Sequence, residues 1–172
     1  MGREIERKFL VTGWKRRKGT RLTQGYLYAG KDKSVRVRLE DGRGTVTIKG
    51  PTRGSERAEY EYSIPAVDAR ELLHTLCEKP LIEKTRSRVR FQGLLWEVDE
   101  FYGDNKGLIV AEVELKRASQ KVSLPPWVGK EVTRDARYLN ANLFKKPYRS
   151  WSKGPSRGAS GRTRRPSRRS KA

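Results

Sequence analysis

Two carboxylates and an ammonium group occupy every second position of the segment Glu4-Ile5-Glu6-Arg7-Lys8, near the start of the chain. In an extended strand, successive side chains point to opposite faces, so Glu4, Glu6 and Lys8 share one face. Carboxylates are oxygen ligands for hard divalent cations, and a neighbouring ammonium group binds phosphate oxygens. A single charged strand face is ordinarily a solvated face, so this chemistry depends on what other strands contribute.

Ionisable side chains also dominate one face of most later strands. Ordinary solvent-facing strands mix in serine, threonine and amides, whereas these faces carry mainly Lys, Arg, Asp and Glu. Charged faces on so many strands therefore indicate a shared charged interior. The residues on these faces are Glu4, Glu6, Lys8, Arg36, Arg38, Lys49, Glu59, Glu61, Lys84, Arg86, Arg88, Glu97, Asp99, Glu112 and Glu114.

The strands that must position these residues are short and are separated by turn motifs such as Asp41-Gly42 and Gln92-Gly93. We predict strands over residues 4–11, 21–28, 34–40, 45–49, 56–64, 81–91, 94–102 and 108–117. We predict helices over residues 67–77 and 135–144, the second with Thr133 as its cap.

Short connections favour antiparallel neighbours, and two helices are few for covering the apolar face of a flat sheet. Closing the sheet removes its edges and gathers the charged faces into one lumen. The predicted fold class is mainly β (α+β). We expect an eight-stranded antiparallel closed β-barrel tunnel with a few flanking helices, including a C-terminal helix.

Opposed charges in one lumen restrict what can bind there. The carboxylates repel one another unless divalent cations lie among them, and the lysines and arginines need an anion. Oxygen ligands, with one histidine and no cysteine cluster, suit Mg²⁺ or Mn²⁺ better than zinc. A metal-bound polyphosphate satisfies both sets of charges.

Composition is consistent with a polyphosphate ligand. The 172 residues carry 40 Lys and Arg against 20 Asp and Glu, a net charge of +20, which favours a polyanionic partner or substrate. The length suits one domain, and the single cysteine, Cys77, excludes an intramolecular disulfide. Without an apolar run of roughly 20 residues or a signal-like N-terminus, we expect a cytoplasmic protein with no membrane contact. We also expect a monomer or homodimer.

The charge is unevenly distributed along the chain. Residues 153–172 hold eight basic and no acidic side chains among Ser, Gly and Pro, so we predict a disordered tail. Residues 1–152, with 32 basic and 20 acidic side chains, form the predicted domain. So many carboxylates are not needed by a plain nucleic-acid binder. Nonspecific contact of the tail with polyanions or nucleic acid stays open as an added role.

The ordered set of motifs resembles the triphosphate tunnel metalloenzymes, also called the CYTH superfamily. Glu4-Ile5-Glu6-Arg7-Lys8 is similar to the family signature E-x-E-x-K, and residues 132–143 resemble the C-terminal segment of its short bacterial members. The resemblance extends over roughly residues 2–148. The intervening motifs, in order, are Val35-Arg36-Val37-Arg38, Thr47-Ile48-Lys49, Glu59-Tyr60-Glu61, Lys84-Thr85-Arg86, Trp96-Glu97-Val98-Asp99 and Ala111-Glu112-Val113-Glu114.

This resemblance implies a tunnel enzyme that hydrolyses inorganic triphosphate with Mg²⁺ or Mn²⁺, using two ions. Metal and cations would stabilise the transferred phosphoryl group during in-line attack by water, without a covalent intermediate. The implied metal ligands are Glu4, Glu6, Asp99, Glu112 and Glu114. The implied phosphate-binding residues are Lys8, Arg36, Arg38, Lys49, Lys84, Arg86 and Arg88. The implied catalytic residues are Glu59, Glu61 and Lys84, the two glutamates placing a second metal or the attacking water.

Other substrates fit the same resemblance. Thiamine triphosphatases, RNA 5′-triphosphatases and class IV adenylate cyclases bind a triphosphate similarly, and nucleoside triphosphates and long polyphosphate belong to the same class. An organic substrate needs an aromatic or hydrogen-bonding platform at the tunnel mouth, for which Tyr26, Tyr28, Trp127 and Tyr138 are candidates. A non-catalytic polyanion-binding or RNA-binding protein is the alternative of another class. Its binding would be mostly electrostatic and sensitive to salt.

Overall fold

The computed structural model describes residues 5–53, 56–117 and 119–151, and these residues form one antiparallel sheet of nine strands. Glu4 and the predicted tail lie outside the described residues. Each neighbouring pair of strands is antiparallel. The strands are β1 (Glu6–Val11), β2 (Thr20–Ala29), β3 (Ser34–Glu40), β4 (Arg43–Arg53), β5 (Glu56–Ile64), β6 (Ile82–Phe91), β7 (Leu94–Phe101), β8 (Ile109–Glu114) and β9 (Val128–Glu131).

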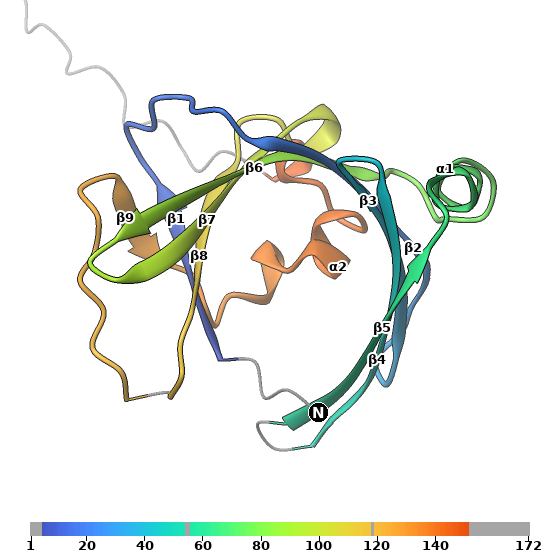
Figure 1. The fold of residues 1–172 in the computed structure, drawn as a ribbon, viewed down its shortest axis with the longest axis horizontal. Coiled ribbons are helices and arrows are strands. Elements are labelled where there is room, and N and C mark those ends of the chain that lie inside the picture. The colour runs from blue at the N-terminus through green and yellow to red at the C-terminus, as the bar shows by residue number, and fades with distance from the viewer. Residues whose placement is uncertain (1–4, 54–55, 118, 152–172) are drawn as a thin grey trace, which may run out of the picture.

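The strand order is β5-β4-β3-β2-β6-β7-β8-β1-β9. Figure 1 shows this sheet curling around a short helix, α2 (Asn140–Leu143), while α1 (Ala66–Thr75) lies outside the curve. The predicted mainly β class is confirmed, and the eight predicted strands correspond to β1 through β8. The four-residue strand β9 was not predicted, because Val128–Glu131 is too short to display an alternating pattern.

The first predicted helix is present as α1, but the second, over residues 135–144, is interrupted. A short 3₁₀ helix, η2 (Ala136–Tyr138), and α2 flank Leu139, whose backbone is extended. Thr133 was wrongly predicted as a helix cap. Its hydroxyl instead accepts a hydrogen bond from the backbone N–H of Lys8, and Asp135 caps η2 by accepting from the backbone N–H of Arg137. The remaining short 3₁₀ helices are η1 (Gly103–Asn105) and η3 (Tyr148–Ser150).

Two apolar clusters cover the outer faces of the sheet. One joins Ala69 and Leu73 of α1 to Val37 of β3. The other contains Phe9 and Trp96 from β1 and β7, and Trp127 packs against it with its ring centroid 5.7 Å from that of Trp96. These clusters leave the opposite side chains of the same strands pointing into the curve of the sheet.

A third cluster lies inside the curve, where it packs the end of α2 against the sheet. It contains Ile82, Phe101, Leu143 and Phe144, and Tyr26 of β2 stacks on the Phe144 ring at 5.1 Å. Ile82 is two residues before Lys84 and Phe101 is two residues after Asp99, so these apolar side chains share a face with charged ones. The interior is thus apolar beside α2 and charged farther along the strands.

Among the described residues, no helix combines the length and apolar character needed to cross a membrane.

Gly25 tests the packing of the segment that follows α1 against the outer face of the sheet. A Cβ atom at Gly25 would lie 2.7 Å from Cys77 Cβ and 2.7 Å from a methyl group of Leu81. We expect Gly25→Ala to lower the free energy of unfolding by about 1–3 kcal/mol through overpacking, as measured by chemical denaturation. Gly50→Ala is the matched control, because its nearest neighbour would be Ala58 Cβ at 3.4 Å. Equal stability of the two variants would contradict this packing.

Candidate functional site

Charged side chains from the inner face of the sheet line a cavity of about 830 Å³. Every predicted site residue that the structure describes lines this cavity, except Lys84 and Asp99, which are buried beneath it. The structure therefore brings together residues from seven strands. The ionisable lining consists of Glu6, Lys8, Arg36, Arg38, Lys49, Glu59, Glu61, Arg86, Arg88, Glu97, Glu112, Glu114 and Lys116.

Strand register places the carboxylates of β1 and β8 side by side. Glu6 pairs with Glu114, and Lys8 pairs with Glu112, across the antiparallel ladder. The Lys8 Nζ atom lies 2.7 Å from Glu112 Oε1 and 3.7 Å from Glu6 Oε1. Residues 132 and 133 hold the Lys8 backbone at both its N–H and its carbonyl group. Strand β1, which carries Glu6 and Lys8, is therefore fixed on one side by β8 and on the other by the segment after β9.

Asp99 is the centre of a buried ion-pair network. It is 1% exposed, and its Oδ2 lies 2.5 Å from Lys84 Nζ, a side chain with no exposed surface. Arg86 donates from Nε to Asp99 Oδ1 and from Nη2 to Oδ2, both at 2.7 Å. Both carboxylate oxygens of Asp99 are thus engaged by cations. The metal-ligand role of Asp99 stays a prediction.

Burial and charge act in opposite directions in this network. Burial disfavours the Asp99 carboxylate, but Lys84 and Arg86 outweigh it and hold the pKa of Asp99 well below its usual range. Burial lowers the pKa of Lys84 to about 8, although Asp99 opposes this shift. The pKa of Arg86 is raised, because its hydrogen bonds to the charged Asp99 outweigh the effect of burial. The network therefore keeps Asp99 ionised at neutral pH.

The network extends from Arg86 toward the cavity. Arg86 bonds to Glu97 and, at 3.2 Å, to Glu112. Arg88 donates to Glu97 at 3.0 Å and to Glu40 at 3.0 Å. Cations on β6 are therefore already paired with carboxylates from β7, β8 and β3.

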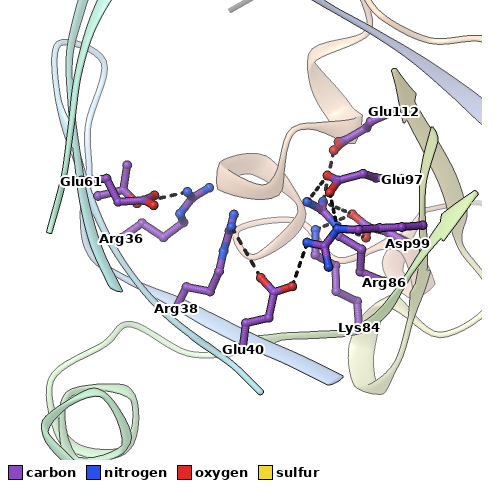
Figure 2. Close-up of polar contacts among 11 residues, drawn as sticks. Arg36, Arg38, Glu40, Glu61, Lys84, Arg86, Glu97, Asp99 and Glu112 are labelled. Atoms are coloured by element: carbon purple, nitrogen blue, oxygen red, sulfur yellow. Dashed lines mark hydrogen bonds and ion pairs between the residues drawn. The ribbon is translucent and has the colours of Figure 1, made fainter. Parts of the chain in front are cut away.

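The opposite wall is formed by β3, β4 and β5. Figure 2 shows Arg36 and Arg38 on this wall, facing Arg86 and Asp99 across the interior. Arg36 Nη2 donates to Thr47 Oγ1 at 3.1 Å, and Thr47 donates to Glu61 at 3.0 Å.

Two further basic residues of this wall differ in how they are paired. Lys49 Nζ lies 2.9 Å from a Glu59 oxygen. The guanidinium of Arg38 lies as far as 4.0 Å from the Glu40 carboxylate. Burial, together with the charges of Arg36 and Arg86, lowers the pKa of Arg38. An anion beside Arg38 would therefore stabilise its charged form.

The donor chemistry of the cavity fits a hard divalent cation. Glu6 and Glu114 supply carboxylate oxygens from adjacent strands, and no histidine or cysteine is among the lining residues that the structure describes. Within residues 5–53, 56–117 and 119–151, no three acidic, histidine or cysteine side chains form a ready metal cluster. Among the described residues, the lining holds seven basic and six acidic side chains, so their charges nearly balance. A divalent cation would supply further positive charge for a phosphate chain.

Several lining or linking residues were not predicted from the sequence. Thr47 connects Arg36 to Glu61, and Glu40 connects Arg38 to Arg88. Both residues have the parity of the charged side chains on β3 and β4, so the alternation is the signal that could have indicated them. Asn140 enters from α2 and also lines the cavity. No sequence pattern indicated that this segment would fold into the interior.

Of the aromatic platform candidates, Tyr26 alone lines the cavity in the described part of the chain. Tyr26 is 5% exposed and is stacked on Phe144. Trp127 packs against Trp96 on the outer face, and Tyr138 packs against Trp151. The cavity is therefore lined mainly by charges and not by rings that would select an organic group.

Comparisons with known proteins agree with this arrangement. The model of the CYTH domain family matches residues 2–148. An inorganic triphosphatase of Acetivibrio thermocellus is 51% identical over 154 residues, covering 88% of this chain and 99% of that protein. An inorganic triphosphatase of Nitrosomonas europaea is 39% identical over 148 residues, covering 81% of this chain and 95% of that protein.

A solved structure supports the same relationship. The crystal structure of the inorganic triphosphatase NE1496 matches with a TM-score of 0.65 and 35% sequence identity. The match covers 84% of this chain and 95% of that one. The curled sheet described above is thus shared with a solved triphosphatase.

Asp99→Asn tests the buried network. Removing the charge leaves Lys84 and Arg86 buried without their shared partner, so we expect a loss of about 3–5 kcal/mol in the free energy of unfolding at pH 7. In the native protein, the folded-state pKa of Asp99 lies below the unfolded value of 3.8. Its stabilising contribution is present above that pH and is lost as the pH falls through the folded-state pKa. The variant should lack this part of the acid dependence in denaturation curves.

Asp104→Asn is the matched control for Asp99→Asn, because Asp104 is exposed in η1. We expect its stability to remain close to that of the native chain. A similar, small effect of both substitutions would show that Asp99 does not hold the network together.

Proposed function

Because the chain belongs to the CYTH domain family, we propose that it is a metal-dependent inorganic triphosphatase, which hydrolyses triphosphate to pyrophosphate and phosphate. The observation that carries this proposal is the single cavity in which carboxylates and cations of all the family motifs meet. The proposal is also supported by the curated relatives, which are themselves inorganic triphosphatases. The enzyme is therefore a hydrolase, and divalent metal dependence follows from its family.

Glu6 and Glu114, together with Glu4, are the proposed ligands for Mg²⁺ or Mn²⁺, and two ions are expected. Glu112 and Asp99 are instead proposed to hold Lys8, Lys84 and Arg86, because their oxygens already bond to these cations. When bound, the metal would neutralise phosphate oxygens and withdraw electron density from the phosphoryl group under attack.

The basic side chains are proposed to align the phosphate chain. Arg36, Arg38 and Lys49 approach it from the β3–β4 wall, while Lys8 and Arg86 approach from the β1–β6 wall. Planar guanidinium groups bind two phosphate oxygens at once and so fix the orientation of each phosphoryl group. This alignment places the bond to be broken in line with an attacking water molecule.

Glu61 is the proposed acceptor of the water proton. Its carboxylate is held by Thr47, which also bonds Arg36, so base and phosphate-binding residue are fixed relative to each other. Water oxygen then forms a bond to the terminal phosphorus as the bridging oxygen leaves with pyrophosphate. Glu59, bonded to Lys49, is proposed to assist in holding this water. Lys84, buried beside Asp99, is proposed to act through the position of Arg86.

Glu6→Gln tests the carboxylate assignment. Loss of one metal ligand should lower kcat for triphosphate by at least roughly 100-fold while the far-UV circular dichroism spectrum is retained. Phosphate release in Mg²⁺ and in Mn²⁺ measures the effect. Glu131→Gln is the control, since Glu131 is paired with Arg7 and does not line the cavity. Undiminished phosphate release by Glu6→Gln would remove this residue from the site.

Substrate choice is tested by a panel of inorganic triphosphate, ATP, thiamine triphosphate and long polyphosphate. We expect the highest kcat/KM for inorganic triphosphate, because Tyr26 is the one aromatic lining residue in the described chain and is already stacked. Chelation of divalent metal should abolish turnover. Preference for ATP or thiamine triphosphate would assign the enzyme to another branch of the family, and no turnover of any compound would favour a polyanion-binding protein.

A further inference from the structure

Three cross-strand neighbours on β2, β3 and β4 carry buried polar atoms that lack hydrogen-bond partners. Gln24 pairs with Arg38, and Arg38 pairs with Thr45, in the ladders of adjacent strands. Among the described residues, neither amide atom of Gln24 has a partner, and Arg38 Nε and Thr45 Oγ1 also have none. Gln24 has no exposed surface at all. The unpaired atoms therefore form one row across three strands.

These side chains point into the curve of the sheet. A Cβ atom on Gly25 would touch Cys77 and Leu81 on the outer face, so the neighbouring Gln24 points inward. Arg38 lines the cavity. Thr45 has the same parity as the cavity-lining Thr47 and Lys49, so it also faces the interior.

The adjacent row on the same strands is different. Tyr26, Arg36, Thr47 and Glu61 are successive register partners, and hydrogen bonds connect Arg36 through Thr47 to Glu61. Among the described residues of that row, Arg36 Nε is the only buried side-chain atom without a hydrogen-bond partner. The strands can therefore satisfy inward polar groups, and the row of Gln24 is an exception.

Buried polar groups without partners destabilise a folded protein, so each such group calls for an explanation, of which a functional role is one. Arg38 is the member of the row that reaches the cavity, and its nearest carboxylate, on Glu40, is 4.0 Å away. The terminal nitrogens of the guanidinium are therefore loosely held. Among the described residues, the Nε atom of Arg38 has no acceptor, and the carbonyl oxygen of Gln24 on the neighbouring strand has no donor.

We propose that Gln24 is a positioning residue for Arg38 in triphosphate binding. When an anion occupies the cavity, the Gln24 carbonyl oxygen accepts a hydrogen bond from Arg38 Nε, and Thr45 supports the same side chain from β4. The two terminal nitrogens of Arg38 then remain available for two oxygens of one phosphoryl group. This inference rests on the proposed function for turnover, but the binding step requires only an anion in the cavity.

Gln24→Met tests the proposal, because methionine has a similar length and no hydrogen-bonding amide. We expect kcat/KM for inorganic triphosphate to fall by about 10-fold to 100-fold, mainly through KM. We also expect the melting temperature of the free protein to stay the same or rise, because an unpaired amide is removed. Unchanged kcat/KM, with or without lower stability, would make Gln24 a packing residue and would overturn the proposal.

A double-mutant cycle with Arg38→Gln tests whether Gln24 acts through Arg38. In the Arg38→Gln background, Gln24→Met should cause little further loss of kcat/KM, because the group that it positions is gone. Full additivity of the two losses would contradict the proposal. Gln24→Glu supplies a second variant of the same shape, whose carboxylate should pair with Arg38 and raise KM further.

Trp96→Phe is the matched control. Trp96 Nε1 is also buried without a partner in the described chain, but Trp96 belongs to the outer apolar cluster. Its substitution should leave kcat/KM per folded molecule unchanged.

The melting-temperature shift caused by triphosphate without divalent metal separates this inference from the proposed function. If the native protein does not hydrolyse triphosphate, the proposed function fails, yet a smaller shift for Gln24→Met would still support the positioning role. An equal shift would overturn it.

Discussion

The pairing of Asp99 with Lys84 and Arg86 is the interaction on which the rest of the site depends. All three side chains are nearly or fully buried, so their charges are stable only when paired. Because they come from β6 and β7, their pairing fixes the relation between these strands, and Arg86 extends it to Glu112 on β8. One wall of the cavity is therefore rigid before any substrate binds, as preorganised electrostatic catalysis requires.

The two walls of the cavity differ in how their charges are compensated. Cations on β6 are satisfied by carboxylates of the protein, whereas in the described chain Arg38 on β3 has a carboxylate 4.0 Å away and an Nε atom without a partner. The first wall therefore provides fixed geometry, and on the second wall Arg38 is available to phosphate oxygens. Since acidic and basic residues nearly balance in the described lining, a divalent cation bound with a phosphate chain would add positive charge to the cavity.

The sequence predicted which side chains share a face, because alternation in a strand does not depend on the rest of the fold. Arg36, Arg38 and Glu61 were assigned to the interior for this reason, and they line the cavity. Alternation could not predict depth. Asp99 and Glu97 share a face, yet one is buried under two cations and the other reaches the cavity, because register across β6 and β7 and the apolar filling of the interior decide this.

The apolar filling also explains why one strand face carries both a core and a site. The segment that was predicted as one helix instead turns at Leu139 and brings Leu143 and Phe144 inside the sheet. Lys84 Nζ lies 5.3 Å from the ring of its register partner Phe101, in fully buried surroundings. Electrostatic interactions are stronger in such surroundings, and unpaired groups are more costly there. The same apolar end that strengthens the Asp99 network therefore also raises the cost of the Gln24 amide, which has no hydrogen-bond partner among the described residues.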